Sequence, residues 1–329
     1  MSLSVNDALE ALSDLYEPVR HVIPSEEWAK FAPDILAIQK LKKDKNAVIL
    51  AHNYMTPEIF HGVADIVGDS LALAREAAKL DADMIIMAGV HFMAETAKLL
   101  NPKMTVLIPD PAAGCSLAEA ITPEDVRALR AQYPGVPIVT YVNTSAAVKA
   151  ECDICCTSGN AKKIVESLGV PEVIMVPDQY LAQNVAAETD VRIIIYQGSC
   201  EVHERFTAQE VKDYRANHKG LAVIAHPECP PDIVKEANFS GSTVGMSDWV
   251  AAHKPKSVLL LTECSMSDNV AIQHPDVHFI KPRHLCPHMK RITLKNIRAS
   301  LESGMHEIHI PESIQAPARQ AVERMIEVR

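Results

Sequence analysis

The run RIIIYQGSC, residues 192–200, is an apolar strand-like segment with a cysteine just beyond its end. The same arrangement occurs in TVLIPDPAAGC at residues 105–115 and in HFIKPRHLC at residues 278–286. Cys115, Cys200 and Cys286 are therefore 85 and then 86 residues apart, and each precedes a helix-like segment. Such regular self-similarity predicts three similar units. If the units pack around a pseudo-threefold axis, their three thiolates converge on one point.

Strand-like and helix-like segments alternate within each unit. The predicted strands are unbroken apolar runs, such as AVILAHNY at 47–54 and SVLLLTE at 257–263. Such strands are buried on both faces, as in parallel sheets covered by helices. The sequence therefore predicts an α/β fold of three similar three-layer αβα domains with parallel sheets and a central active site. The predicted parts are a helical segment at 1–45 that packs on the core, units at 46–115, 116–200 and 201–299, and a C-terminal segment at 300–329 that completes the first unit.

The second and third units match in register at one offset. Four pairs lie 85 residues apart: Tyr141 and His226, Asn143 and Glu228, Ser158 and Thr243, and Asn184 and Asn269. The first unit is less regular, because the offset from His52 to Tyr141 is 89 residues. The first unit also lacks an obvious fourth strand.

Composition restricts the class of function. The chain has 329 residues and a net charge of −10, which argues against a large nucleic-acid footprint. The sequence shows neither an N-terminal signal core nor a run of about 20 apolar residues that could span a membrane. We therefore expect a cytoplasmic protein without a membrane partner. In that compartment the eight cysteines are expected to be metal ligands, reactive thiols or core residues rather than disulfides.

Three converging thiolates suit a metal centre with one open coordination position. A [4Fe–4S] cluster held by three cysteines leaves one iron open, and a zinc ion with three cysteines and water is an alternative. Either would act as a Lewis acid. A third interpretation is that the thiols are structural. We expect the remaining cysteines to fill the core or line its edge: Cys152, Cys155, Cys156, Cys229 and Cys264.

Several polar residues lie where predicted strands end, which is where open α/β sheets bind ligands. Imidazoles, phenols and a carboxylate there supply acid–base groups. Hydroxyls close to predicted helix starts either bind an anion or cap the helices. His203, three residues after Cys200, is a candidate for contact with a ligand of the metal, and the basic cluster Lys281–Arg291 either offsets negative charge or faces solvent. The strand-end candidates are His52, Tyr54, Tyr141, Asn143, His226 and Glu228, and the hydroxyl candidates are Ser70, Ser158, Ser242 and Thr243.

These segments resemble the quinolinate synthase family over residues 48–301. The segments that carry the resemblance are AHNY, GDSLALA, GVHFMAETAKLL, GCSLAEA, YVNTSAAVKAECDICCTSGNA, GSCEVHERF, AHPEC, GSTVGM, TEC and CPHMKRITL. One departure is Tyr196-Gln197, where the family often has Trp-Pro. The departure affects local packing but leaves Cys200 in place.

The resemblance implies a [4Fe–4S] cluster on Cys115, Cys200 and Cys286. It implies a transferase that condenses iminosuccinate with dihydroxyacetone phosphate to quinolinate, in de novo NAD biosynthesis. It also implies a link to an aspartate-oxidising enzyme. The implied catalytic groups are Tyr54, His52, His226 and Glu228, and the implied substrate contacts are His52, Ser70, Tyr141, Asn143, Ser158, His226, Glu228 and Thr243, beside Ser242.

Two other functions fit the same residues. One is a zinc-dependent lyase or hydrolase that uses the three cysteines. The other is a non-catalytic iron–sulfur sensor of a metabolite, which would leave His52, Tyr54 and Glu228 without a chemical role. The metal content separates the first of these from the cluster enzyme, and turnover separates the second.

Overall fold

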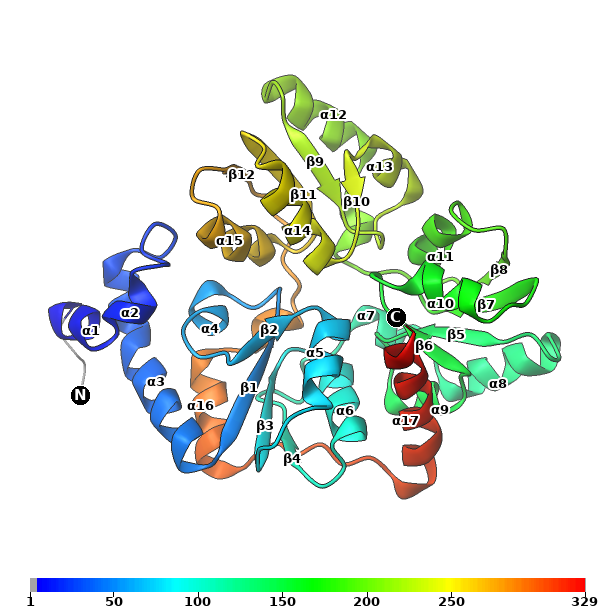
Figure 1. Cartoon of the computed structure of the whole chain (residues 1–329), viewed down its shortest axis with the longest axis horizontal. Coiled ribbons are helices and arrows are strands. Elements are labelled where there is room, and N and C mark those ends of the chain that lie inside the picture. The colour runs from blue at the N-terminus through cyan, green and yellow to red at the C-terminus, as the bar shows by residue number, and fades with distance from the viewer. Residues whose placement is uncertain (1–4, 329) are drawn as a thin grey trace.

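The computed structural model describes residues 5–328 and forms three four-stranded parallel sheets there. Their strand orders are β2-β1-β3-β4, β6-β5-β7-β8 and β10-β9-β11-β12, so one topology is used three times. Figure 1 shows each sheet in its own wedge around a common centre. The strands are β1 (Ala47–His52), β2 (Ile66–Gly68), β3 (Met84–Ala88), β4 (Thr105–Leu107), β5 (Ile138–Tyr141), β6 (Ile154–Cys156), β7 (Glu172–Val176), β8 (Arg192–Ile195), β9 (Ala222–Ala225), β10 (Phe239–Ser240), β11 (Ser257–Leu261) and β12 (His278–Ile280).

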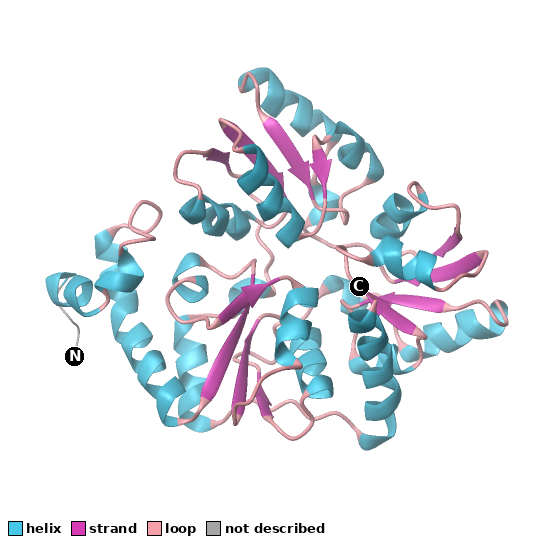
Figure 2. Ribbon diagram, viewed as in Figure 1, coloured by secondary structure: helices cyan, strands magenta, loops and turns pink. Residues whose placement is uncertain are grey.

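Helices flank the sheets, as Figure 2 shows by colour. In the first unit, α3 and α16 pack together on one face, and α5 and α6 pack together on the other. The predicted three-layer α/β architecture is therefore confirmed. The helices are α1 (Val5–Ala11), α2 (Ser13–Tyr16), α3 (Ser25–Asp44), α4 (Pro57–Phe60), α5 (Ser70–Ala77), α6 (His91–Leu100), α7 (Ser116–Glu119), α8 (Pro123–Gln132), α9 (Ala146–Ala150), α10 (Ala161–Ser167), α11 (Gln179–Ala186), α12 (Ala208–Asn217), α13 (Pro231–Glu236), α14 (Thr243–His253), α15 (Cys264–Gln273), α16 (Leu294–Ser303) and α17 (Glu312–Glu327).

Burial explains why the apolar runs form strands. All four residues of β5 are buried, as are the last four residues of β1, β3 and β11. Each fully buried aliphatic side chain contributes about 1.5–3 kcal/mol relative to an exposed one. The edge strand β8 differs, because Arg192 is exposed and the three isoleucines that follow are only partly buried.

The first unit does have a fourth strand, which was not evident in the sequence. Strand β2 pairs parallel with β1, and Ile66 lies opposite Leu50. It is only three residues long, and Val67 is exposed. So short and partly exposed a segment has no apolar run to mark it in the sequence.

The C-terminal segment contacts two units. Helix α16 packs against α3 and β3 of the first unit. The chain then runs antiparallel to β4, where the Ile308 N–H donates to the Val106 carbonyl at 2.9 Å. Helix α17 packs against α9 and β6 of the second unit. The boundary drawn at residue 300 falls within α16, and the division into domains stays a prediction.

A second repeat accompanies the cysteines. Thr122, Thr207 and Thr293 each form a capping box at the start of α8, α12 and α16. Each threonine stands seven residues after one of the three cysteines. By its position after a cysteine and a capping threonine, α16 corresponds to α8 and α12. It packs on the first sheet, however, because the chain has no fourth unit in the described residues. The chain therefore returns to its first unit after the third cysteine.

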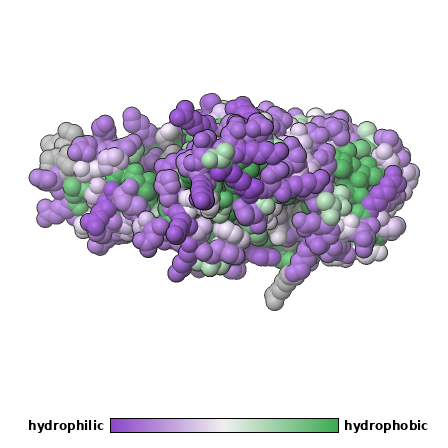
Figure 3. Space-filling model, turned by 90° about the horizontal axis from the view of Figure 1, so that it is seen from above, coloured by the Kyte–Doolittle hydropathy of each residue, from purple (hydrophilic) through white to green (hydrophobic). Residues whose placement is uncertain are grey.

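The surface carries mostly polar residues on the side drawn in Figure 3, where the molecule is flat and elongated. Across the described residues, 5–328, the structure has no helix of the length and apolar character that a membrane span requires.

Candidate active site and metal centre

One central cavity gathers nearly all of the predicted site residues. The exception is Ser242, whose hydroxyl caps α14 by accepting from the Gly245 N–H at 3.3 Å and which lines a groove outside the cavity. Asp69, rather than Ser70, caps α5, and Ser70 lines the cavity. The predicted residues that line the cavity are His52, Tyr54, Ser70, Cys115, Tyr141, Asn143, Ser158, Cys200, His226, Glu228, Thr243 and Cys286.

Two of the histidines that line the cavity, His52 and His226, are held by the same backbone contact. His52 Nδ1 accepts from the Tyr54 N–H at 3.2 Å, and His226 Nδ1 accepts from the Glu228 N–H at 3.3 Å. An accepting Nδ1 places the ring proton on Nε2. Burial lowers the pKa of His52 to about 4 and that of His226 to about 3. Both rings are therefore neutral near pH 7, and each has a fixed Nε2–H donor.

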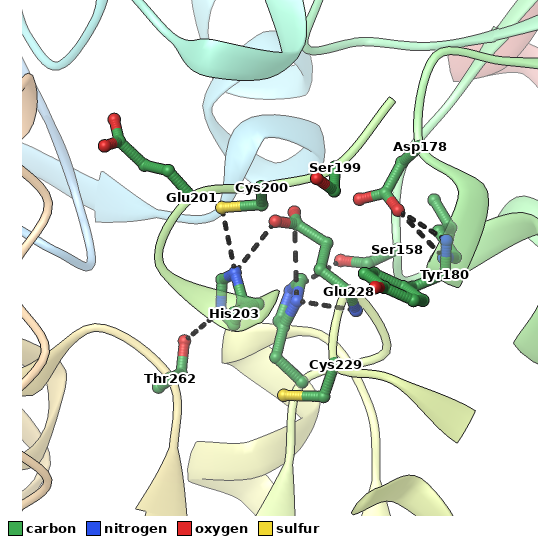
Figure 4. Close-up of polar contacts among 12 residues, drawn as sticks. Ser158, Asp178, Tyr180, Ser199, Cys200, Glu201, His203, Glu228, Cys229 and Thr262 are labelled. Carbon is green, nitrogen blue, oxygen red and sulfur yellow. Dashed lines mark hydrogen bonds and ion pairs between the residues drawn. The ribbon is translucent and has the colours of Figure 1, made fainter. Parts of the chain in front are cut away.

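Glu228 is a buried carboxylate with three polar neighbours. The Tyr141 hydroxyl donates to Oε1 at 2.5 Å, and His203 Nδ1 lies 2.9 Å from Oε2. Burial alone would raise the pKa of Glu228, but the neighbouring imidazoles of His203 and His226 and these hydrogen bonds lower it. Glu228 is thus ionised at neutral pH and lies at the centre of the polar cluster in Figure 4.

Both phenols of the cavity keep their protons. Burial, followed by the charge of Glu228, raises the pKa of Tyr54 and of Tyr141 well above the ordinary value. The Tyr54 hydroxyl lies 2.5 Å from Thr262 Oγ1, which in turn lies 2.9 Å from His203 Nε2. A continuous chain of polar groups therefore joins Tyr54 to Glu228 through Thr262 and His203.

His203 and Thr262 are the functional candidates that sequence reasoning placed least well. His203 was expected only as a neighbour of Cys200, and its Nδ1 does lie 3.2 Å from that sulfur. Thr262 was not singled out, although it follows β11 directly at the same sheet edge as the other candidates. Its position after a buried strand was the available signal.

The side chains of the basic cluster at 281–291 point in different directions. Lys281 pairs with Asp268, and Arg291 pairs with Asp110 at 3.0 Å. Lys290 points inward and donates to the Tyr54 carbonyl at 2.8 Å, beside the fully buried Glu263. Within the same cluster, His288 lines the cavity, and its Nε2 lies 3.0 Å from Oε1 of Glu201, another lining residue.

The three cysteines have matching surroundings. Burial raises the pKa of all three thiols, that of Cys115 to about 12. Backbone N–H groups two and three residues further on oppose this effect by stabilising each thiolate. They belong to Leu117 and Ala118 for Cys115, to Val202 and His203 for Cys200, and to His288 and Met289 for Cys286.

The thiolates also repel one another. Negative charge on Cys286 raises the pKa of Cys115, and charge on Cys115 raises that of Cys200. Three buried thiolates that raise one another's pKa need a positive partner to stay ionised, and a metal centre supplies one. The donor set therefore fits a metal group.

The spacing of the ligand atoms distinguishes kinds of metal. One zinc ion with Zn–S bonds of about 2.3 Å brings its sulfurs to roughly 4 Å from one another. Among residues 5–328, the group whose ligand atoms all lie within 4.8 Å is Cys200, His203 and Glu228, not the three cysteines. Cysteines spread more widely suit a cluster, in which each binds a different iron.

The other five cysteines lie outside the cavity lining. Cys155 and Cys156 are fully buried in β6, and Cys152 is buried beside them. Burial raises the pKa of Cys152 and Cys155, which makes them poor nucleophiles. The CxxC spacing at 152–155 therefore belongs to the core of the second unit.

The chain matches the family model described as Quinolinate synthetase A protein over residues 36–327. It is 65% identical to the quinolinate synthase of Agrobacterium fabrum over 325 residues, which cover 99% of this chain and 94% of the relative. It is 68% identical to quinolinate synthase 2 of Mesorhizobium japonicum, with 95% and 97% covered. It is 69% identical to the quinolinate synthase of Xylella fastidiosa, with 91% and 88% covered. The chain therefore belongs to the quinolinate synthetase A family.

Proposed function

We propose that this protein is a quinolinate synthase, an enzyme that condenses iminosuccinate with dihydroxyacetone phosphate to quinolinate and releases phosphate and two waters. One observation carries the proposal: three cysteines with matching backbone N–H groups share a cavity with two neutral histidines, two phenols and a carboxylate. The named relatives, which match along almost the whole chain, support it.

The resident group in this proposal is a [4Fe–4S] cluster on Cys115, Cys200 and Cys286. When bound, it supplies a Lewis-acidic iron with an open position, which can polarise a carboxylate or hydroxyl oxygen. The spacing of the ligand atoms favours the cluster over the alternative of a zinc lyase or hydrolase. The acid–base groups around it favour an enzyme over a non-catalytic sensor.

The hydroxyls of the second and third units would bind the phosphate of the triose. His226 Nε2–H donates to Ser158 Oγ at 3.1 Å, and Asn53 Nδ2 donates to Thr243 Oγ1 at 2.8 Å. Each hydroxyl thereby accepts from a protein donor and keeps its own proton for the ligand. Thr243 is also the first residue of α14, whose free N–H groups favour an anion. Ser70 adds a third hydroxyl from the first unit.

The remaining groups would orient the substrates and move protons. The Nε2–H of His52 can donate to a carbonyl or carboxylate oxygen at neutral pH, and Asn143 offers an amide in the same cavity. Glu228 can accept a proton, and the Tyr54 hydroxyl can supply one and be reprotonated through Thr262 and His203. Iminosuccinate hydrolyses easily, so we propose that an aspartate-oxidising enzyme in the same compartment, the cytoplasm, delivers it.

Cysteine replacement under anaerobic conditions tests this function. We expect C115A, C200A and C286A each to lose the cluster absorbance and to lower quinolinate formation by more than about 100-fold, because three ligands are needed to hold the group. C264A is the matched control, since Cys264 is also partly exposed but does not line the cavity. Iron, sulfide and zinc are measured on the same samples.

The outcomes separate the candidate functions. Protein with about four irons that forms quinolinate agrees with the proposal. One zinc per chain and turnover of another substrate would instead identify the zinc enzyme. An intact cluster without any turnover would identify the sensor, and full activity in any of the three cysteine variants would refute the ligand assignment.

A further inference from the structure

A recurring contact holds the turn that follows the first strand of each unit. In the first unit this turn follows β1 and contains Tyr54. The amide nitrogen of Asn269 donates to the carbonyls on either side of that tyrosine, those of Asn53 at 3.0 Å and Met55 at 2.8 Å. One buried side-chain nitrogen thus brackets one cavity residue.

The same contact occurs at the other two turns. Asn184 Nδ2 donates to the carbonyls of Pro227 and Cys229, both at 2.9 Å, and so brackets Glu228. In the second unit a lysine takes the place of the asparagine. Lys149 Nζ donates to the Val142 carbonyl at 2.8 Å and to the Thr144 carbonyl, which bracket Asn143. The bracketed residues, Tyr54, Asn143 and Glu228, occupy equivalent places two residues after His52, Tyr141 and His226.

Two of the three contacts cross between units. Asn269 lies on α15 of the third unit and reaches the first unit, and Asn184 lies on α11 of the second unit and reaches the third. Lys149 lies on α9 and holds the turn of its own unit. The exposed fractions of Asn269, Asn184 and Lys149 are 2%, 9% and 0%, so water cannot easily replace these donors. A buried carbonyl without a donor is costly, which favours one turn geometry while the neighbouring unit is docked.

We propose that Asn269, Asn184 and Lys149 are positioning residues that hold Tyr54, Glu228 and Asn143 in the cavity, and that the first two make this geometry depend on docking between units. The kinetic part of this inference rests on the proposed function. Asn269 and Asn184 touch no reacting group themselves, so their effect on the reaction must pass through Tyr54 and Glu228.

A matched control separates positioning from simple stability. Asn101 is also a buried asparagine, 8% exposed, whose amide donates to two carbonyls, those of Ala77 at 2.9 Å and Ala97 at 3.1 Å. It lies at the end of α6 and does not line the cavity. We expect N269A, N184A and N101A to lower the melting temperature by similar amounts. Only N269A and N184A should lower kcat, by about 100-fold, because a displacement of about 1 Å has that effect.

Double variants show which residue each asparagine positions. We expect N269A to lower kcat by less than about twofold when Tyr54 is already phenylalanine, but to keep its full effect in E228Q. N184A should show the reverse, with a full effect in Y54F and little in E228Q. Losses in kcat that match N101A, or that add fully in both backgrounds, would overturn the proposal.

Crystal structures of the variants give a readout that does not depend on the reaction. In N269A we expect the 2.5 Å contact between Tyr54 and Thr262 to be lost and that between Tyr141 and Glu228 to remain, with the opposite pattern in N184A. Unmoved side chains in both variants would refute the positioning role. Unaltered protein that forms no quinolinate would instead refute the proposed function. The Tyr54–Thr262 and Tyr141–Glu228 distances in the variants would still test whether Asn269 and Asn184 position Tyr54 and Glu228. K149M extends the test to Asn143, because methionine keeps the length of the side chain without its donors.

Discussion

At the scale of single residues, the protonation of the cavity is set by burial and by backbone contacts. His52 and His226 each use Nδ1 to accept a backbone N–H, so the neutral tautomer with a proton on Nε2 is selected. Protonating either ring would place a donor against that N–H. The two rings are therefore suited to donate hydrogen bonds without carrying charge.

This arrangement predicts a loss of stability in acid. In the folded protein the pKa of His52 is about 4 and that of His226 about 3, against about 6.5 in the unfolded chain. Between pH 6.5 and 4 the unfolded state binds more protons, so the free energy of unfolding falls as the pH falls. We expect up to roughly 1.4 kcal/mol per pH unit for each histidine. The measurement is the melting temperature of metal-free protein from pH 7 to 4.5.

Variants identify the source of this acid sensitivity. H52Q and H226Q should each flatten the dependence of melting temperature on pH, because each removes an imidazole that binds a proton in the unfolded chain but not in the folded protein over most of this range. H309Q, at an exposed position, should leave the slope unchanged. Slopes that are the same in all four proteins would show that other groups govern the acid response.

At the scale of elements, the repeat is a strand, a cysteine loop, a capping box and a helix. The capping threonines lie at a fixed distance from the cysteines, so each loop is held between the end of a strand and the start of a helix. We expect T122A, T207A and T293A each to lower the free energy of unfolding by about 1 kcal/mol, since each removes an N-cap. Denaturant midpoints at constant slope give these values.

The control for the caps is a threonine away from any helix start. T189A removes a hydroxyl that accepts a long, 3.4 Å hydrogen bond from the Val191 N–H, so its effect should be much smaller. A capping variant that unfolds at the same denaturant concentration as the unaltered protein would contradict the role of that box.

Much of this element pattern could be predicted from the sequence, because parallel strands buried on both faces leave long apolar runs. The runs around Ile49, Val139 and Leu259 therefore marked the three sheets. The three-residue strand at Ile66–Gly68 left no such mark and was missed. The polar contacts of Thr262, Asn184 and Lys149 with the site were also missed, because they depend on which turns and helices meet in space.

At the scale of the whole molecule, the chain closes on itself. Each of the three cysteines lies between the last strand of one unit and a capped helix, and the third of these helices, α16, returns to the first sheet. The C-terminal helix α17 then packs on the second unit. A group held by all three cysteines would therefore join every unit to its neighbours at the centre of Figure 1.

The last prediction follows from this closure. A group that binds the folded protein and not the unfolded chain raises stability by its binding free energy. Removal of the proposed cluster by an anaerobic chelator should therefore lower the melting temperature. Because the three ligands lie on three separate loops, hydrogen exchange should rise together at residues 113–122, 198–207 and 284–293. Cys155 and Cys156 of β6 lie outside the cavity lining, so no rise in hydrogen exchange is expected around β6.

The single variant C200A provides the sharper form of this experiment, because it removes a ligand from one loop alone. If the group joins the three units, exchange should rise at all three cysteine loops, including the two whose sequence is unchanged. If each loop is instead stabilised only by its own strand and capping box, the rise would be confined to residues 198–207. That local result would show that the units dock independently of the metal group, and that only the packing of α16 and α17 joins the C-terminal segment to the first and second units.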